Sequence, residues 1–235
     1  MSLRPIYFDT ETTGTKPQVD RLVEIAAYDP VRDKTFERLI NPQMPIPEEV
    51  IAIHNITDEM VKDAPTFEKV AEEFIAFCEG EVALVAHNNE AFDKPFLEAE
   101  MSRCQLSIHS EWIYIDTLKW SRKYRKDLPK HNLQYLRKVY NFPANNAHRA
   151  LDDVITLARV FEAMIGDLTF EQIYKLLQEE KLLERMPFGK HQGKKLQEIP
   201  KDYFAWLHKN NVFEKPENQL LKESIKKLGI LEKIS

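Results

Sequence analysis

The sequence predicts an α/β fold in which a mixed sheet is flanked by helices, followed by a small C-terminal domain. Its first 40 residues contain three segments of strand length, two of them joined by a connection short enough for an antiparallel hairpin. Between residues 66 and 165, segments with helical periodicity alternate with short apolar strands, which is typical of helices packed on the faces of a sheet. Beyond residue 166, glycine, proline and aromatic clusters indicate a second folding unit.

The antiparallel part of the predicted sheet comes from extended segments at about 5–11, 22–29 and 34–40. The connection over residues 29–33 contains Pro30 and is short. We therefore expect the second and third strands to pair as an antiparallel hairpin. A proline-rich bend with Pro42, Pro45 and Pro47 follows.

Helices and strands alternate in the next hundred residues. Thr66 is expected to cap a helix that runs to about residue 79, because apolar residues recur there at helical spacing and Gly80 follows. Residues 82–86 (VALVA) predict a short, fully buried strand. The predicted main domain, residues 1–167, is completed by a helix at about 92–104, a strand at 113–116, and helices at about 132–140 and 149–165.

The remaining chain is predicted to form a helical linker at 168–186 and a small module at 187–235. The segment 186–194 holds two glycines and a proline, which is consistent with a tight hairpin. An aromatic run at 203–207 (YFAWL) follows. These features favour a separate folding unit of about 50 residues.

The composition argues against several classes of protein. No segment approaches the roughly 18 consecutive apolar residues of a membrane span, and the chain does not open with a secretion signal. We therefore expect a cytoplasmic protein without a membrane partner. Cys78 and Cys104 are too few for a disulfide framework or a thiolate zinc site, so we expect buried free thiols.

The distribution of charge indicates a nucleic-acid partner, although the net charge is −5. Residues 119–138 contain eight basic residues against the single acid Asp127. Residues 187–235 contain ten lysines against six acids, which leaves the first 186 residues at −9. Local basic surface on an acidic protein suits a polyanion that is bound briefly and released. Lysines that solvate helix faces are the alternative explanation.

Four carboxylates stand where loops meet predicted strands or helices. Asp9 and Glu11 are two residues apart in the first strand, so they point to the same face. Asp93 follows the buried strand at the start of a helix, and Asp153 lies in the first turns of the long helix. Such a cluster needs cations to offset repulsion, and hard divalent ions prefer oxygen ligands. We predict two Mg²⁺ or Mn²⁺ ions, the usual arrangement for attack on a phosphodiester.

His148 is the candidate general base. It stands five positions before Asp153, so we expect it on the loop that leads into the helix. A neutral imidazole there can take a proton from the attacking water. Asp152 competes with Asp153 as a ligand, but helical geometry turns it about 100° away, so we favour Asp153.

Four segments resemble the motifs of a known family: FDTETTG at 8–14, HNIT at 54–57, AHNNEAFD at 86–93 and HRALDD at 148–153. Over residues 4–166 the chain resembles the DEDDh 3′–5′ exonucleases, most closely the proofreading epsilon subunits of bacterial DNA polymerase III. The resemblance implies a ribonuclease H-like fold for an exonuclease domain at 1–167, two magnesium or manganese ions, and release of nucleoside 5′-monophosphates from a 3′ end. It also implies that the metal ligands are Asp9, Glu11, Asp93 and Asp153, and that His148 is the general base.

Several further residues are candidates for substrate contacts. Thr12 and Thr13 are expected to donate hydrogen bonds to the terminal nucleotide, although a turn at the end of a strand would use the same residues. His54 lies in a segment that resembles the family's base pocket, and a capped turn is the alternative. Asn88, or its neighbour Asn89, is expected either to contact substrate or to cap the next helix.

The sequence thus predicts a two-metal 3′–5′ exonuclease that acts on single-stranded or frayed DNA 3′ ends in repair or proofreading, with a DNA polymerase or repair complex as a protein partner. One alternative is an RNA 3′-end trimming enzyme of the ribonuclease T or oligoribonuclease type, which DTETTG resembles less closely. Another is a polymerase-accessory binding module without catalysis, against which the complete ligand set argues.

The tail resembles a small module found attached to exonucleases, on the segments MPFGKHQGKKL and IPKDYFAWL. It departs from the polymerase-tethering tail of a dedicated epsilon subunit. Its lysines favour either a second nucleic-acid contact or the solvated exterior of a packing unit. We therefore place a candidate nucleic-acid-binding module at 187–235.

Overall fold

The computed structural model describes residues 3–107, 111–143, 150–179 and 182–230. The chain divides into two compact units, residues 1–177 and residues 178–235. Within the described residues, the helices are all too short or too polar to cross a membrane.

The first unit is built on a five-stranded mixed sheet with strand order β3-β2-β1-β4-β5. β1 (Arg4–Thr12), β2 (Leu22–Asp29) and β3 (Lys34–Leu39) pair antiparallel. The pairing of β2 with β3 is the hairpin that the short connection predicted. β4 (Val82–Ala86) and β5 (Ile113–Asp116) continue the sheet parallel to β1. The mixed sheet flanked by helices confirms the predicted fold class. The carboxyl ends of β1, β4 and β5 therefore lie along one edge of the sheet.

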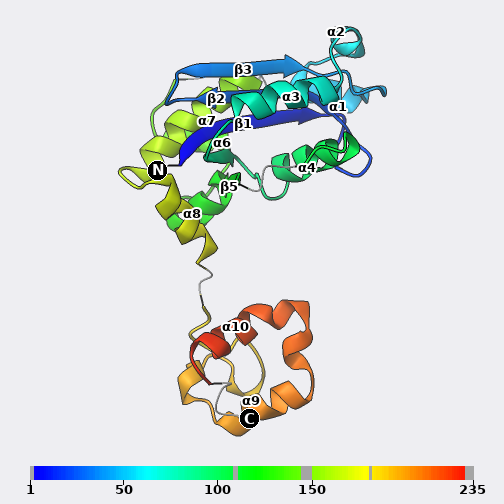
Figure 1. Cartoon of the computed structure of the whole chain (residues 1–235). Helices are drawn as coiled ribbons and strands as arrows, with labels where there is room; N and C mark the ends of the chain where they lie inside the picture. The colour runs from blue at the N-terminus through cyan, green and yellow to red at the C-terminus, as the bar shows by residue number, and fades with distance from the viewer. Residues whose placement is uncertain (1–2, 108–110, 144–149, 180–181, 231–235) are drawn as a thin grey trace. The chain divides into compact units, whose positions relative to one another are not determined.

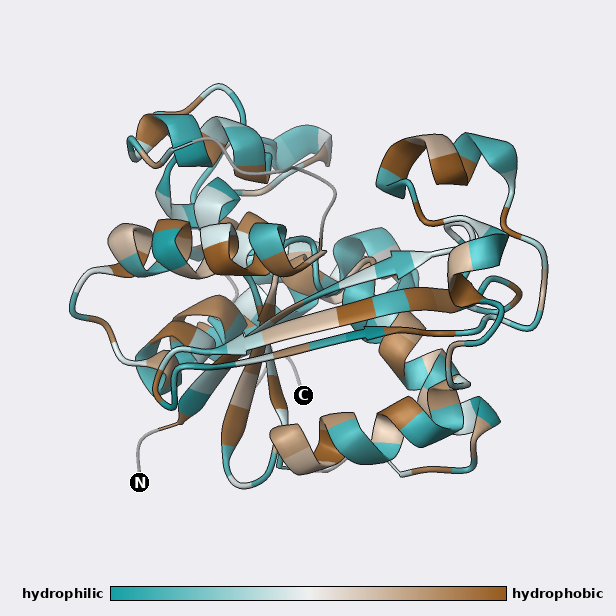
Figure 2. Cartoon of the chain, turned by 90° about the horizontal axis from the view of Figure 1, so that it is seen from above, coloured by the Kyte–Doolittle hydropathy of each residue, from teal (hydrophilic) through white to brown (hydrophobic). Residues whose placement is uncertain are grey.

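One face of the sheet is covered by α3 (Phe67–Phe77) and α4 (Asp93–Arg103) (Figure 1). Ile6 and Phe8 of β1 are fully buried against these helices. Phe74 of α3 lies at the centre, with edge contacts to Phe36 at 5.7 Å and Trp112 at 6.0 Å between ring centroids. Figure 2 shows long hydrophobic segments in the strands and mixed hydrophobic and hydrophilic residues in the helices beside them. Because Ile6 and Phe8 face α3 and α4, the residues between them in β1 face the other side of the sheet.

The other face is covered by α7 (Ala150–Ile165), α5 (Thr117–Tyr124) and α8 (Phe170–Gln178). Tyr7 of β1 is buried there, with Phe161 of α7 at 6.5 Å and Phe170 of α8 at 6.4 Å between ring centroids. α6 (Leu133–Val139) packs beside α7. Because strand side chains alternate, the odd-numbered residues of β1 face α7.

Three helices of the first unit were not predicted: α1 (Glu48–His54), α2 (Asp58–Val61) and α5. α1 and α2 are short, and α5 lies in a stretch dominated by charged residues, so their apolar residues were not recognised as helical. The predicted linker at 168–186 also needs correction. Ile173 and Leu177 of α8 are buried in the core beneath α7, so the first unit extends to Leu177.

The second unit has its own core, formed by residues that include Met186, Leu196, Phe204, Phe213 and Ile225. The predicted reversal near 186–194 is present, since the Met186 amide donates to the Lys194 carbonyl at 2.9 Å. α9 (Lys201–Lys209) and α10 (Gln219–Lys227) follow. Four 3-10 turns connect these elements: Gly189–His191, Leu196–Glu198, Val212–Glu214 and Pro216–Asn218.

Candidate active site

β1 presents Asp9 and Glu11 on the face that packs against α7. Both follow the alternation of Tyr7, whose ring is buried on that face. Asp9 and Glu11 are partly buried, whereas their neighbours Thr10 and Thr12 are buried. The central position of β1 in the sheet therefore holds two carboxylates on a rigid strand.

The pairing of β1 with β2 brings in a fifth carboxylate that the sequence analysis did not single out. Glu24 is the direct partner of Glu11 in the antiparallel register and is only 4% exposed. Residues opposite each other in such a pair lie on the same face of the sheet. Only the register of β1 with β2 could have identified Glu24, and that register cannot be predicted without the exact alignment of the two strands.

Asp93 enters the site from the first residue of α4, immediately beyond β4. Its Oδ1 accepts hydrogen bonds from the Thr10 amide at 3.1 Å and the Thr10 hydroxyl at 2.9 Å. The carboxylate is buried and connected to the residue that separates Asp9 from Glu11. β1 therefore supplies two acids and also orients a third.

Asp153 lies in the first turn of α7, the helix that packs on β1 and β2. Its Oδ1 accepts a hydrogen bond from Gln134 Nε2 of α6 at 3.3 Å. Gln134 Oε1 in turn accepts from Arg137 Nε at 2.9 Å, and Arg137 Nη1 donates to the Phe142 carbonyl. A chain of hydrogen bonds thus orients Asp153. Gln134 and Arg137 were not predicted, since only the packing of α6 beside α7 brings them here.

Burial and nearby negative charges raise the pKa values of three of these carboxylates. Burial raises the pKa of Asp9 well above its usual range, and the charges of Asp93, Glu11, Asp153 and Glu24 raise it further. Burial also raises the pKa of Glu11 to about 8, with added repulsion from Glu24, Asp153 and Asp93. The pKa of Asp93 rises to about 7, mainly through burial, although its hydrogen bonds oppose the shift. The predicted cluster is therefore brought together by the fold.

The donor set fits a hard divalent cation by charge and by chemistry. All of the clustered groups are carboxylates, and an ion among them would offset the repulsion that raises their pKa values. Among the described residues, no group of three or more His, Cys, Asp or Glu side chains is arranged to hold a metal ion.

His148, the predicted general base, lies outside the described residues. α7 begins at Ala150, two positions later, and contains Asp153 in its first turn. Asp152 and Asp153 are both partly buried, and it is Asp153 that raises the pKa of Asp9 and Glu11.

The predicted substrate contacts Thr12 and Thr13 make hydrogen bonds within their own loop. Thr12 Oγ1 donates to the Gly14 carbonyl at 2.5 Å. Thr13 Oγ1 accepts from the Arg21 amide at 3.0 Å, and the Thr13 amide donates to the Arg21 carbonyl at 2.8 Å. Both side chains are buried, so they shape the loop that follows β1.

His54 is the last residue of α1 and is only 1% exposed. Its Nδ1 accepts a hydrogen bond from the Ile56 amide at 3.0 Å, while Nε2 makes no hydrogen bond among the described residues. Burial lowers the pKa of His54, and the nearby Thr12 backbone opposes that shift. The ring is therefore held neutral beside the end of β1.

Neither asparagine caps α4, which was the alternative role considered for them. The N-cap of α4 is Phe92, without a side-chain hydrogen bond. Asn88 has a left-handed φ of 73°, and its amide donates to Asp116 Oδ1 at 3.2 Å. Asn89 is fully buried and donates from Nδ2 to the carbonyls of Leu84 and Ile115 at 3.1 and 3.2 Å. Asn89 thus joins β4 to β5, and the loop that carries Asn88 folds over Asp116.

The basic stretch 119–138 is partly used in internal contacts. Lys119 Nζ pairs with Glu90 at 2.8 Å, and Arg125 pairs with Asp127 at 2.9 Å. Lys123 binds the Leu176 carbonyl, and Arg137 supports Gln134. Charge counts along the sequence therefore overestimate the cationic surface available here to a polyanion.

Two family models match separate parts of the chain. A model described as "Exonuclease" matches residues 6–161. A second model, described as "Putative quorum-sensing-regulated virulence factor", matches residues 174–224.

Similar proteins include "DNA polymerase III PolC-type" of Staphylococcus aureus, which is 35% identical over 190 residues. That match covers 77% of this chain but only 13% of the polymerase, so the chain spans a small part of this relative. An Escherichia coli exonuclease I–single-stranded DNA complex has a TM-score of 0.62 at 18% identity, over 75% of this chain and 43% of that one. Exonuclease X in complex with 5′-overhanging duplex DNA has a TM-score of 0.54 at 27% identity, over 74% and 99% of the two chains.

Proposed function

The chain belongs to the exonuclease family whose model spans its first unit, and from that premise we propose that it is a metal-dependent 3′–5′ exonuclease. Its proposed reaction is the stepwise release of nucleoside 5′-monophosphates from single-stranded or frayed DNA 3′ ends. The observation that carries the proposal is the mutual repulsion of Asp9, Glu11, Asp93 and Asp153 at one end of the sheet.

Asp9, Glu11, Asp93 and Asp153 would hold two Mg²⁺ or Mn²⁺ ions. When bound, such ions supply positive charge to the attacking and leaving oxygens of the phosphodiester. The protein contributes by fixing the carboxylates before substrate arrives. Thr10 orients Asp93 through two hydrogen bonds, and Gln134 orients Asp153 through one. Preorganised charge of this kind accounts for most catalysis of phosphoryl transfer.

His148 is proposed to take the proton from the attacking water. In the sequence it precedes α7 by two positions, and Asp153 lies in the first turn of that helix. A neutral imidazole close to carboxylates is a suitable acceptor near neutral pH.

The terminal nucleotide is proposed to lie against the loop after β1, near Thr12, Thr13, His54 and Asn88. The internal hydrogen bonds of Thr12 and Thr13 support a positioning role, in which the loop shape is fixed for substrate. Buried, neutral His54 closes this region beside Thr12. The amide of Asn88 is already bonded to Asp116, so its side chain is the part proposed to reach substrate.

DNA is the proposed substrate, and repair or polymerase-associated trimming is the proposed setting. Two structural neighbours are described as complexes with single-stranded or overhanging DNA, and the similar Staphylococcus aureus protein is a DNA polymerase. A polymerase or repair complex is therefore the proposed protein partner.

The test is digestion of 3′-labelled single-stranded DNA, mismatched duplex and RNA with Mg²⁺ or Mn²⁺. Asp153→Asn is expected to lower the rate at least about 100-fold, because one charged oxygen ligand is lost. Asp152→Asn is the matched control, with the same chemical change one position away, and should retain most activity. Glu24→Gln should lower the rate less, about three- to tenfold, because it reduces the negative field without removing a proposed ligand.

Equal loss in Asp152→Asn and Asp153→Asn would contradict the proposed ligand assignment. Faster digestion of RNA than of DNA would show that RNA, and not DNA, is the preferred substrate. Tight DNA binding without any release of mononucleotides would remove the enzymatic proposal altogether.

A further inference from the structure

The second unit exposes a large aromatic side chain that its core does not use. Trp206 on α9 is 54% exposed, whereas Trp112 and Trp120 in the first unit are 6% and 3% exposed. Phe204 and Leu207 of the same helix are buried in the second core. α9 is therefore anchored by its apolar face, and Trp206 is presented outward.

Trp206 borders a cavity of about 710 Å³, which lies entirely within the second unit. The cavity is lined by the first 3-10 turn and by the start of α9. Its lining residues are Gly189, Lys190, His191, Pro200, Asp202, Tyr203 and Trp206.

The aromatic rings of this cavity form an ordered set. Trp206 and Tyr203 are nearly parallel, with 13° between their planes and 6.0 Å between centroids. The His191 ring meets Tyr203 edge-on, at 4.6 Å and 75°. A flat partner that stacks on Trp206 would therefore extend an existing aromatic array, whose members are already fixed.

Gly189 permits the close approach of Tyr203. A Cβ atom at position 189 would lie 2.6 Å from the Tyr203 hydroxyl oxygen, which is too close for real atoms. The φ angle of Gly189 is also +71°, a conformation that other residues adopt at a cost. The turn and the aromatic ring therefore fit each other only with glycine at this position.

Positive charge surrounds the aromatic set on the side of the turn. Lys190 Nζ lies 5.3 Å from the centroid of the Tyr203 ring. The Lys194 amide donates to the His191 carbonyl at 3.1 Å, so the backbone of Lys194 lies against this turn. Loss of hydration lowers the pKa of His191, and the charges of Lys194 and Lys190 lower it further. Asp202 is the carboxylate in the lining, at the α9 side of the cavity. A bound anion is therefore expected beside Lys190 and Lys194.

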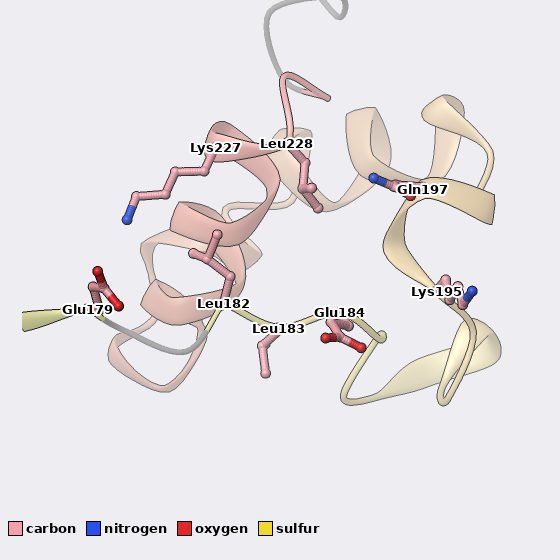
Figure 3. Close-up of a pocket in the computed structure, with 8 residues that line it drawn as sticks. All are labelled: Glu179, Leu182, Leu183, Glu184, Lys195, Gln197, Lys227 and Leu228. Atoms are coloured by element: carbon pink, nitrogen blue, oxygen red, sulfur yellow. The ribbon is translucent and has the colours of Figure 1, made fainter. Parts of the chain in front are cut away.

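Another cavity of the second unit provides a contrast. It measures about 620 Å³. The residues that line it, drawn in Figure 3, have balanced charges and no aromatic ring. Its lining residues are Glu179, Leu182, Leu183, Glu184, Lys195, Gln197, Lys227 and Leu228. Neither stacking nor attraction of an anion is favoured there.

We propose that Trp206, Tyr203, Lys190 and Lys194 form a stacking site for single-stranded nucleic acid, in which a base packs on Trp206 and a neighbouring phosphate pairs with the lysines. Every base has a flat face, so such a site binds strands with little sequence preference. The charge of residues 178–235, twelve basic against nine acidic, favours a polyanion over a neutral peptide. Binding of a strand at this site does not depend on the proposed nuclease function. Only the statement that the bound strand is the enzyme's substrate rests on that function.

Binding is measured on the full chain with EDTA present, which prevents metal-dependent digestion. Oligothymidylate and oligouridylate are titrated while tryptophan fluorescence and anisotropy are recorded over a series of salt concentrations. The variants are Trp206→Ala, Trp206→Phe and Lys190→Ala. Lys226→Ala is the matched control, because Lys226 is an exposed lysine on α10 outside the cavity lining.

Oligonucleotide is expected to quench the fluorescence of the exposed Trp206. Trp206→Ala should raise Kd about tenfold, and Trp206→Phe should retain most of the affinity because it keeps a stacking surface. Lys190→Ala should reduce the slope of log Kd against log salt by about 0.7, the value for one phosphate contact in a single strand. Lys226→Ala should change neither quantity.

A separate assay keeps this proposal distinct from the nuclease function. Thymidine 5′-(p-nitrophenyl phosphate) is a single nucleotide, so its hydrolysis with Mn²⁺ requires the nuclease site alone and should be unchanged in all four variants. No hydrolysis in any protein, together with quenching by oligonucleotide, would remove the nuclease function and keep the stacking site. Unchanged Kd in Trp206→Ala, or quenching by a proline-rich peptide but by neither oligonucleotide, would overturn the stacking site.

Discussion

The two units of this chain use charged side chains in opposite ways. In residues 1–177, where the net charge is −8, carboxylates gather at the end of a rigid sheet, where burial and the charges of neighbouring carboxylates raise the pKa of Asp9 and Glu11. In residues 178–235, where it is +3, lysines surround exposed aromatic rings on short helices and turns. The contrast indicates that a rigid sheet is needed where like charges must be held together. Short helices and turns are sufficient to present lysines that attract a flexible polyanion.

A second contrast lies within the first unit. Glu100 is fully buried, yet it pairs with Arg21 through Nε at 2.7 Å and with Arg103 through Nη1 at 3.1 Å. Asp29 is 1% exposed and pairs with Arg4. The pKa of Asp9, by comparison, is raised by burial and then by the charges of four other carboxylates. The fold thus places arginine beside the buried acids Glu100 and Asp29, and gathers other acids around Asp9 in the candidate site.

The largest expected effect comes from Asp9→Asn. Nuclease activity should fall at least about 100-fold, because one of the proposed metal ligands is replaced by a neutral group. In EDTA the same variant should unfold about 2–4 °C higher than the wild type, since one of five mutually repelling carboxylates is removed. Digestion of labelled DNA and thermal unfolding measure the two quantities. A lower Tm together with normal activity would show that Asp9 serves structure.

Glu100→Gln also replaces a buried carboxylate by an amide, but Glu100 has arginine partners. Its effect on stability should therefore be opposite to that of Asp9→Asn. We expect a loss of about 3 kcal/mol in the free energy of unfolding, because the amide leaves Arg21 and Arg103 without their charged partner. Urea denaturation measures this loss. Equal effects of Asp9→Asn and Glu100→Gln on stability would remove the distinction between the two kinds of buried acid.

The smallest expected effect concerns the second unit. Gly189→Ala should push Tyr203 away from the turn and weaken the binding of oligothymidylate about threefold, because the stacking surface is disturbed while the lysines remain. Fluorescence titration in EDTA measures the change, with Gly193→Ala as the control. Gly193 has a similar φ of +80°, but a Cβ there would meet no atom within 4 Å. Equal weakening by both substitutions would assign the effect to the turn conformation alone.

Local patterns in the sequence were sufficient for most of the sheet and for the acids of the candidate site. The spacing of Asp9 and Glu11 already set their common face, because side chains alternate along any strand. Asp93 and Asp153 were identified because Asp93 begins a helix and Asp153 lies in the first turn of one. Helices α1, α2 and α5 were missed, since most of their residues are polar or exposed.

Contacts between distant segments could not be read in this way. Glu24 joins the acid cluster only through the register of β1 with β2, and Gln134 reaches Asp153 only because α6 packs beside α7. α8 was assigned to a linker because its sequence does not reveal that Ile173 and Leu177 fill the space beneath α7. The buried hydrogen bonds of Asn89 likewise depend on the spacing of β4 and β5.

The sequence by itself thus determined which residue types carry the chemistry and which face of each element they occupy, because both follow from spacing along the backbone. The tertiary structure alone decided which acids repel one another, which have arginine partners, and which aromatic rings meet at the cavity of the second unit. Electrostatic and stacking energies depend on distances through space, and packing sets those distances between residues far apart in the chain.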